Sequence, residues 1–204
     1  DSSTSRGLGD VYKRQTLVSR FGYHLTQGQL NTELGFSVLS GKLHDGVRNA
    51  GDYQAYALHL NSRYQRWQLQ LQHSQYQYDL DGIERIAVGA YGFYDSIAAE
   101  AKSATANLAY DVPVQWGPVT DLQFYNNYSL VYDKSDQSRT TLMNVTGFSI
   151  AAGSLFTYVD YVHARNQPFV GGSMAGDSVE EEQRFNINIL SLIHISEPTR
   201  RRGI

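Results

Sequence analysis

Apolar and polar residues alternate along much of the chain with a period of two. The clearest stretch is 66–72, where Trp67, Leu69 and Leu71 alternate with polar residues. This spacing predicts a β-strand with one apolar and one polar face. The same alternation recurs in the segments Phe21 to Leu25, Leu30 to Val38, Tyr56 to Leu60, Leu122 to Leu130 and Phe185 to Ile189. Helical spacing is not sustained anywhere, so the pattern predicts an all-β protein.

Short turns and longer polar loops separate these segments. Two short turns contain Gly28 and Gly153, and longer loops cover 41–51, 132–139 and 166–182. Strands joined by alternating short and long connections are typical of an antiparallel up-and-down sheet, here of about nine or ten strands. Such a sheet closes into a barrel or leaves edges that promote aggregation.

Two kinds of barrel fit this pattern. A soluble barrel fills its interior with apolar side chains, whereas a transmembrane barrel turns them towards lipid and lines its lumen with polar ones. The predicted polar faces carry long or charged side chains, and tyrosines lie towards strand ends, where membrane barrels have aromatic girdles. These features favour a partial transmembrane β-barrel. The tyrosines are Tyr76, Tyr78, Tyr125, Tyr128, Tyr132, Tyr158 and Tyr161.

Both ends of the chain differ in character from the middle. Residues 1–15 read DSSTSRGLGDVYKRQ and residues 190–204 read LSLIHISEPTRRRGI. Both resemble translated sequencing-adapter read-through, which flanks unrelated inserts in metagenomic assemblies. We therefore expect 1–15 and 190–204 to be adapter-derived scars without a native fold. Residues 16–189 are then a partial barrel, cut at both ends.

The net charge of the segment between the two ends differs from that of the whole chain. The whole chain carries a formal net charge of −3. Residues 1–15 contribute +1 and residues 191–204 contribute +2, which leaves −6 for the segment between them. Because the basic tail belongs to a scar, it does not support a nucleic-acid partner.

Several kinds of chemistry lack a signal in the sequence. The chain contains no cysteine, so disulfides and Cys-based zinc sites are excluded. No run approaches the ~18 consecutive apolar residues that a transmembrane helix needs. Common hydrolase, phosphate-loop and zinc-protease motifs are also missing. We predict that the protein is not an enzyme and uses no cofactor or metal.

Four segments carry a family resemblance: Asn107 to Val119, Leu122 to Ser129, Ala151 to Tyr161 and Arg184 to Ile189. Together they resemble the phosphate-selective porin O and P family of outer-membrane barrels. The resemblance implies a homotrimeric diffusion channel of roughly sixteen strands in the outer membrane of a Gram-negative bacterium. This chain would represent about its C-terminal half, and the channel would conduct phosphate or other small anions.

Strand parity places four arginines on the predicted polar face: Arg20, Arg63, Arg66 and Arg184. The guanidinium group matches phosphate oxygens in geometry and stays charged. These residues are our candidates for attracting anions in the lumen. The alternative is that they balance nearby Asp and Glu side chains on the barrel wall.

Three alternatives stay open at this point. Burial of Trp67, Leu69, Leu71, Phe185 and Ile187 in a packed core would indicate a soluble ligand-binding β-barrel. Loops that plug the lumen would indicate a structural or adhesin barrel without a pore. Residues 84–95 form either an additional crossing strand or an extracellular loop that folds into the lumen. If 84–95 is not a crossing, then the turns near Gly28 and Tyr64, the 112–118 connection and the Gly153 turn all lie at one end of the sheet, the periplasmic end.

Overall fold

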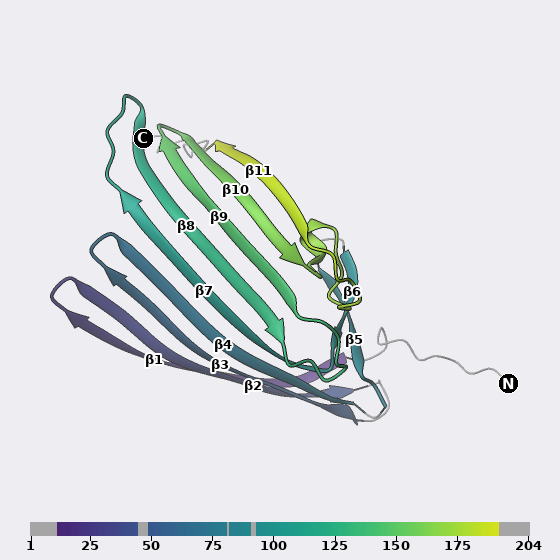
Figure 1. Cartoon of the computed structure of the whole chain (residues 1–204). Coiled ribbons are helices and arrows are strands. Elements are labelled where there is room, and N and C mark those ends of the chain that lie inside the picture. The colour runs from purple at the N-terminus through teal and green to yellow at the C-terminus, as the bar shows by residue number, and fades with distance from the viewer. Residues whose placement is uncertain (1–11, 45–48, 81, 91–92, 192–204) are drawn as a thin grey trace, which may run out of the picture.

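The computed structural model describes residues 12–44, 49–80, 82–90 and 93–191 (Figure 1). Nine antiparallel strands form one curved sheet, each paired with its neighbour in the order β1-β2-β3-β4-β7-β8-β9-β10-β11. Their bounds are Tyr12–Gln27 (β1), Leu30–His44 (β2), Asn49–Tyr64 (β3), Trp67–Leu80 (β4), Glu100–Val112 (β7), Val119–Tyr132 (β8), Thr141–Ala152 (β9), Leu155–Arg165 (β10) and Glu182–Ser191 (β11). This confirms the all-β, up-and-down prediction. Because β1 and β11 are the edges of the sheet, closure into a barrel remains a proposal.

The connections alternate between the two ends of the sheet. Two-residue turns join β1 to β2, β3 to β4 and β9 to β10, and each contains a residue with positive φ: Gly28, Gln65 and Gly153. The 113–118 connection lies at the same end, which we call the turn end. The longer connections 133–140 and 166–181 lie at the opposite, loop end. The predicted grouping of short connections is therefore confirmed.

Residues 84–95 are not a crossing strand. They fall largely in a separate hairpin of two strands, β5 (Arg85–Ala90) and β6 (Phe93–Ala98). The hairpin is not hydrogen-bonded into the nine-stranded sheet and lies at its loop end (Figure 1). Ile86 of β5 packs with Leu43, Tyr53 and Leu80, which lie on one face of the main sheet. The segment therefore lies outside the nine-stranded sheet and packs against one face of it, and its place in a lumen stays a prediction.

The pairing register sorts the side chains into two faces, because residues directly opposite across a ladder point to the same side. One row runs from Arg63 through Gln68, Ala109 and Tyr125 to Gly147, Asp160 and Asn186. The neighbouring row runs from Tyr64 through Trp67, Tyr110, Phe124 and Phe148 to Val159 and Ile187. We call these sides the polar face and the apolar face. The separation of polar from apolar side chains is least complete in β9, where Asn144 and Thr146 lie on the apolar face.

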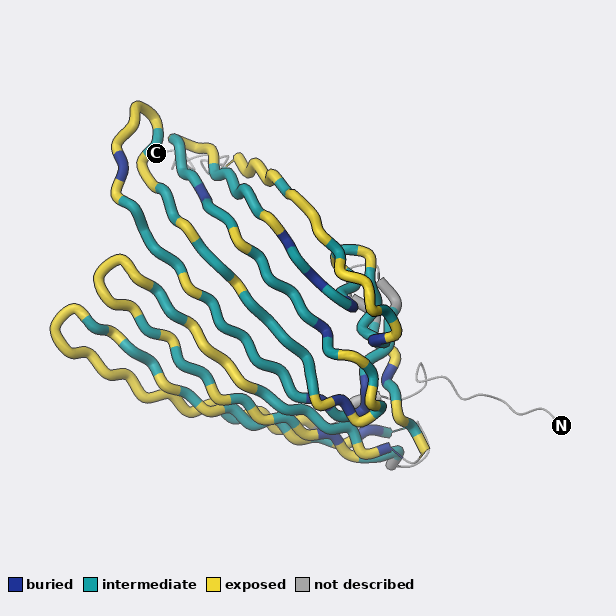
Figure 2. Tube along the Cα trace, in the orientation of Figure 1, coloured by how far each residue is buried: buried dark blue, intermediate teal, exposed yellow. Residues whose placement is uncertain are grey.

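The apolar face does not enter a packed core. Trp67 is 47% exposed, Leu71 40%, Phe185 64% and Ile187 59%, and Leu69 is half-buried. The buried residues gather mainly at the loop end, around the β5–β6 hairpin (Figure 2). Of the described residues, no helix is long and apolar enough to cross a membrane. The arrangement expected of a soluble barrel, with these five residues in its core, is therefore absent from this sheet.

Regular structure extends slightly into both predicted scars. Residues 12–15 pair with β2, with a register shift between Lys13 and Gln15, and β11 continues through Leu190 to Ser191. These few residues pair in strands because ladder hydrogen bonds form between backbones whatever the side chains, and the origin of the two segments stays a prediction. Residues 1–11 and 192–204 lie outside the described residues.

Candidate functional site: the polar face and its loop contacts

The polar face is hollowed along its length by pockets that several strands line together. One pocket of about 320 Å³ is bordered by residues from β1 to β7, including Arg20, His59 and Asn107. Another of about 380 Å³ is bordered by residues from β4 to β10, including Gln68, Tyr125 and Asp160. A larger pocket of about 670 Å³ lies on the other side of the sheet, where apolar-face residues of β1 to β4 such as Phe21, Leu34 and Leu58 border it. The two faces therefore differ in the chemistry of their pockets, polar on one side and apolar on the other.

Arg20 lies in a charge cluster with Glu33 and His59. Its Nη2 donates to Glu33 Oε1 at 2.7 Å and lies 3.0 Å from His59 Nε2, while His59 Nε2 lies 3.3 Å from the same Glu33 oxygen. The His59 ring lies over Gly35, where an added Cβ would come within 2.1 Å of the ring. Glycine is thus required for this cluster. The positive charge of Arg20 is balanced by Glu33, as the alternative interpretation of the lumen arginines expects.

The other three predicted arginines have different surroundings. Arg63 is exposed on the polar face and makes no hydrogen bond or ion pair with another described residue. Arg184 donates from Nη1 to the Phe169 carbonyl at 3.1 Å, near the loop end. Arg66 lies in the β3–β4 turn, so strand parity does not determine where its side chain points. The structure therefore disperses the four residues and does not bring them together.

A second cluster on the polar face crosses three strands. The Tyr125 hydroxyl of β8 donates to Asp160 Oδ1 of β10, and Gly147 of β9 lies between them. An added Cβ at Gly147 would come within 2.6 Å of that carboxylate oxygen and 2.5 Å of the Val159 carbonyl oxygen. The absence of a side chain at Gly147 therefore lets Tyr125 reach across a strand.

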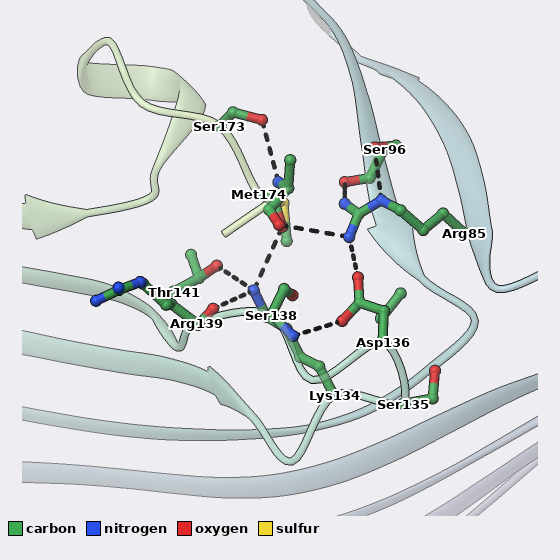
Figure 3. Close-up of polar contacts among 12 residues, drawn as sticks. Arg85, Ser96, Lys134, Ser135, Asp136, Ser138, Arg139, Thr141, Ser173 and Met174 are labelled. Carbon is green, nitrogen blue, oxygen red and sulfur yellow. Dashed lines mark hydrogen bonds and ion pairs between the residues drawn. The ribbon is translucent and has the colours of Figure 1, made fainter. Parts of the chain in front are cut away.

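The loop end of the polar face is held by contacts that sequence reasoning missed. Arg85 of the hairpin forms an ion pair with Asp136 of the 133–140 loop, and its Nη2 donates to the Ser96 carbonyl at 2.7 Å (Figure 3). Arg85 also donates to the Ala175 carbonyl at 3.4 Å. One side chain thus joins the hairpin to both long loops.

Asp95 makes a second connection between the hairpin and the 166–181 loop. It accepts hydrogen bonds from the Ser173 hydroxyl and the Met174 amide, both at 2.8 Å, and from the Ser96 amide at 2.7 Å. Burial raises the pKa of Asp95, but these three hydrogen bonds outweigh burial and the net pKa is lowered. The carboxylate is therefore charged at neutral pH.

Lys134 is a buried cation beside this connection. Its Nζ donates to the Arg139 carbonyl at 2.6 Å, the Thr141 hydroxyl at 3.1 Å and the Met174 carbonyl at 3.3 Å (Figure 3). Burial first, and the positive charge of Arg85 second, lower the pKa of Lys134 to about 8. The three oxygen acceptors favour the charged form, so Lys134 holds two loops together as an ammonium at neutral pH.

An aromatic row borders the apolar face at its turn end. It consists of Tyr64, Trp67, Tyr110, Phe124 and Phe148 on five consecutive strands of the sheet. The rings of Trp67 and Tyr110 are 4.6 Å apart, and those of Phe124 and Phe148 are 6.0 Å apart.

The predicted aromatic girdle was wrong for four of its seven tyrosines. Tyr76, Tyr78, Tyr125 and Tyr158 lie on the polar face, because each shares strand parity with polar neighbours such as Gln72, Gln123 and Asp160. Tyr128, Tyr132 and Tyr161 do lie on the apolar face.

Comparisons with protein-family models, curated proteins and solved structures found no match to this chain. The class that the structure itself defines is an all-β antiparallel sheet with one polar face and one exposed apolar face. The resemblance to the phosphate-selective porins stays a prediction.

Proposed function

We propose that this chain forms part of the wall of an outer-membrane β-barrel porin, through which small solutes diffuse passively. The observation that carries the proposal is the apolar face, whose large side chains are exposed on strands from β1 to β11 while the opposite face is polar. In water such a surface is unfavourable, and its usual partner is lipid or another protein. Membrane-spanning sheets have this arrangement because lipid replaces water on their outer side.

The height of the apolar face supports a membrane-spanning role. On β4, β7 and β8, eight residues separate the aromatic row from a more polar row, formed by Gln75, Lys102 and Tyr132. At ~3.3 Å per residue this separation is about 26 Å along the strand, or about 20 Å across the membrane for a tilt of roughly 40°. The apolar band of outer-membrane barrels is roughly 25 Å tall. Lys102, in the more polar row, forms an ion pair with Asp133 at 2.5 Å, and such a charged pair suits the headgroup region of a membrane.

The proposed solutes are phosphate or other small anions, and this part rests on the porin resemblance together with Arg63. Arg63 is exposed on the polar face, in a pocket of about 300 Å³ that His24 and Glu33 also border. It is a better candidate than Arg20, whose charge Glu33 balances. A cation without a partner raises the local concentration of anions at its surface.

A planar lipid bilayer tests this function. The full chain is inserted from detergent, and the reversal potential is measured across a KCl gradient for wild type, Arg63→Ala and Arg66→Ala. We expect ion conductance with anion preference, a shift towards cations in Arg63→Ala, and no shift in Arg66→Ala, which removes the same charge from a turn. Cation preference in the wild type, or equal shifts in both variants, would contradict the anion assignment.

The second candidate is an outer-membrane barrel without a pore. It is favoured by one observation, the packing of the β5–β6 hairpin against the polar face at the loop end. Absence of conductance from chain that has inserted into the bilayer would support this candidate over the porin.

A further inference from the structure

The pocket of about 380 Å³ on the polar face has a chemistry that differs from the arginine-bearing end of that face. Its volume lies within the roughly 300–1,000 Å³ of small-molecule sites. Five carboxamides border it: Gln68, Gln70, Asn107, Gln123 and Asn127. No lysine, arginine or histidine is among its lining residues.

Several of these carboxamides are held in fixed orientations. Gln68 Nε2 and Gln123 Nε2 both donate to Asp111, at 2.9 and 2.6 Å, and Asn107 Nδ2 donates to Gln70 Oε1 at 3.4 Å. Each of the two glutamines bound to Asp111 keeps a carbonyl oxygen and a second N–H for other partners. Asn127 is exposed and its side chain bonds to no other described residue. The pocket therefore presents donors and acceptors side by side.

Two tyrosine rings complete the pocket. Tyr125 and Tyr158 lie edge to face with their centroids 6.3 Å apart, and the Tyr125 hydroxyl is fixed by Asp160. Aromatic faces pack well against the C–H faces of sugar rings, while mixed donors and acceptors match hydroxyl groups, which both donate and accept.

We propose that this pocket binds an uncharged polyhydroxylated solute, such as a saccharide ring. The charge balance argues against an anion, because Asp160 borders the pocket, Asp111 accepts hydrogen bonds from two of its glutamines, and no cation is among its lining residues. The cation that the register places beside it, Arg63 opposite Gln68, borders the adjacent pocket. A metal ion is also a poor fit, because no group of three or more His, Cys, Asp or Glu among the described residues is placed to hold one. The inference concerns the same polar face as the proposed porin, but binding at the pocket requires neither a pore nor lipid.

Binding is measured by isothermal titration of the full chain refolded in detergent, with maltose, inorganic phosphate and calcium chloride as separate probes. Asn127→Ala is the main variant, because the Asn127 side chain is exposed and makes no hydrogen bond to another described residue. Asn61→Ala is its matched control, an exposed asparagine on the same face outside this pocket. Tyr158→Leu tests the ring, with Tyr161→Leu on the apolar face of the same strand as its control.

We expect maltose to bind, and its Kd to rise about fivefold in Asn127→Ala, as for the loss of one hydrogen bond. Tyr158→Leu should raise it further, whereas Asn61→Ala and Tyr161→Leu should leave it unchanged. No binding of maltose, tighter binding of phosphate or calcium, or equal effects of Asn127→Ala and Asn61→Ala would overturn the inference. Maltose binding by chain that forms no conducting channel would sustain the inference and count against the porin, and a conducting channel without maltose binding would do the reverse.

Discussion

The guanidinium of Arg85 is ion-paired with the carboxylate of Asp136, although 51 residues separate them in the sequence. The side chain of Asp136 is only 7% exposed, and Arg85 also bonds to backbone carbonyls of Ser96 and Ala175. The pair therefore connects the β5–β6 hairpin to the loops that follow β8 and β10.

Replacement of Arg85 by Gln should loosen the hairpin without unfolding the sheet. The buried Asp136 carboxylate would lose its charged partner, a cost of about 1–3 kcal/mol to the local structure. Hydrogen exchange should quicken in 85–98 and in 133–140, and should stay unchanged in β1 and β2. Arg139→Gln, in the same loop with an exposed side chain, is the control. Equal exchange rates in the two variants would show that the ion pair does not hold the hairpin.

Gly147→Ala should destabilise the sheet, because the added methyl group would meet the Val159 carbonyl oxygen at 2.5 Å and the Asp160 carboxylate at 2.6 Å. The expected loss is about 1–3 kcal/mol in the free energy of unfolding. Gly22→Ala is the matched control on the same face, since its Cβ would meet only Glu33 at 3.4 Å. Urea unfolding in detergent measures both, and comparable losses would argue against the close approach at Gly147.

Stability should rise with pH above about 8 because of Lys134. Its pKa is about 8 in the folded chain and near 10.5 in the unfolded chain, so between these values the unfolded state binds more protons. The cost of burying the charge is fully present below pH 8 and is relieved as pH rises towards 10.5. The gain should be roughly 1–3 kcal/mol, and Lys134→Met should lack it. Thermal unfolding between pH 7 and 10 measures this, and parallel curves for both proteins would contradict it.

The alternation of side chains along a strand explains which parts of the fold could be predicted from the sequence. Gln68 and Gln72 alternate with Trp67 and Leu71 on one strand, and this pattern alone assigned their faces correctly. The same rule applied to Tyr125, between Gln123 and Asn127, places it on the polar face. The girdle prediction overrode parity with the general preference of tyrosine for membrane interfaces, and for Tyr125 it was wrong.

Strand parity could not predict the contacts between the loops or the clusters on the polar face. Arg85, Asp95 and Lys134 lie in irregular or hairpin segments, where no periodicity indicates a direction, and their partners come from loops distant in sequence. Gly35 and Gly147 give no signal by themselves, because their role depends on the registers of three strands. The anion role of Arg63 remains a prediction of parity and resemblance.

The fluorescence of Trp67 in lipid vesicles tests the central claim, that the apolar face contacts lipid. The chain has two tryptophans, Trp67 in the aromatic row and Trp116 in the 113–118 connection, so Trp116→Phe and Trp67→Phe isolate each one. After insertion into phosphatidylcholine vesicles, brominated acyl chains should quench Trp67 strongly and Trp116 weakly. Equal, weak quenching of both tryptophans would contradict a lipid-facing apolar sheet.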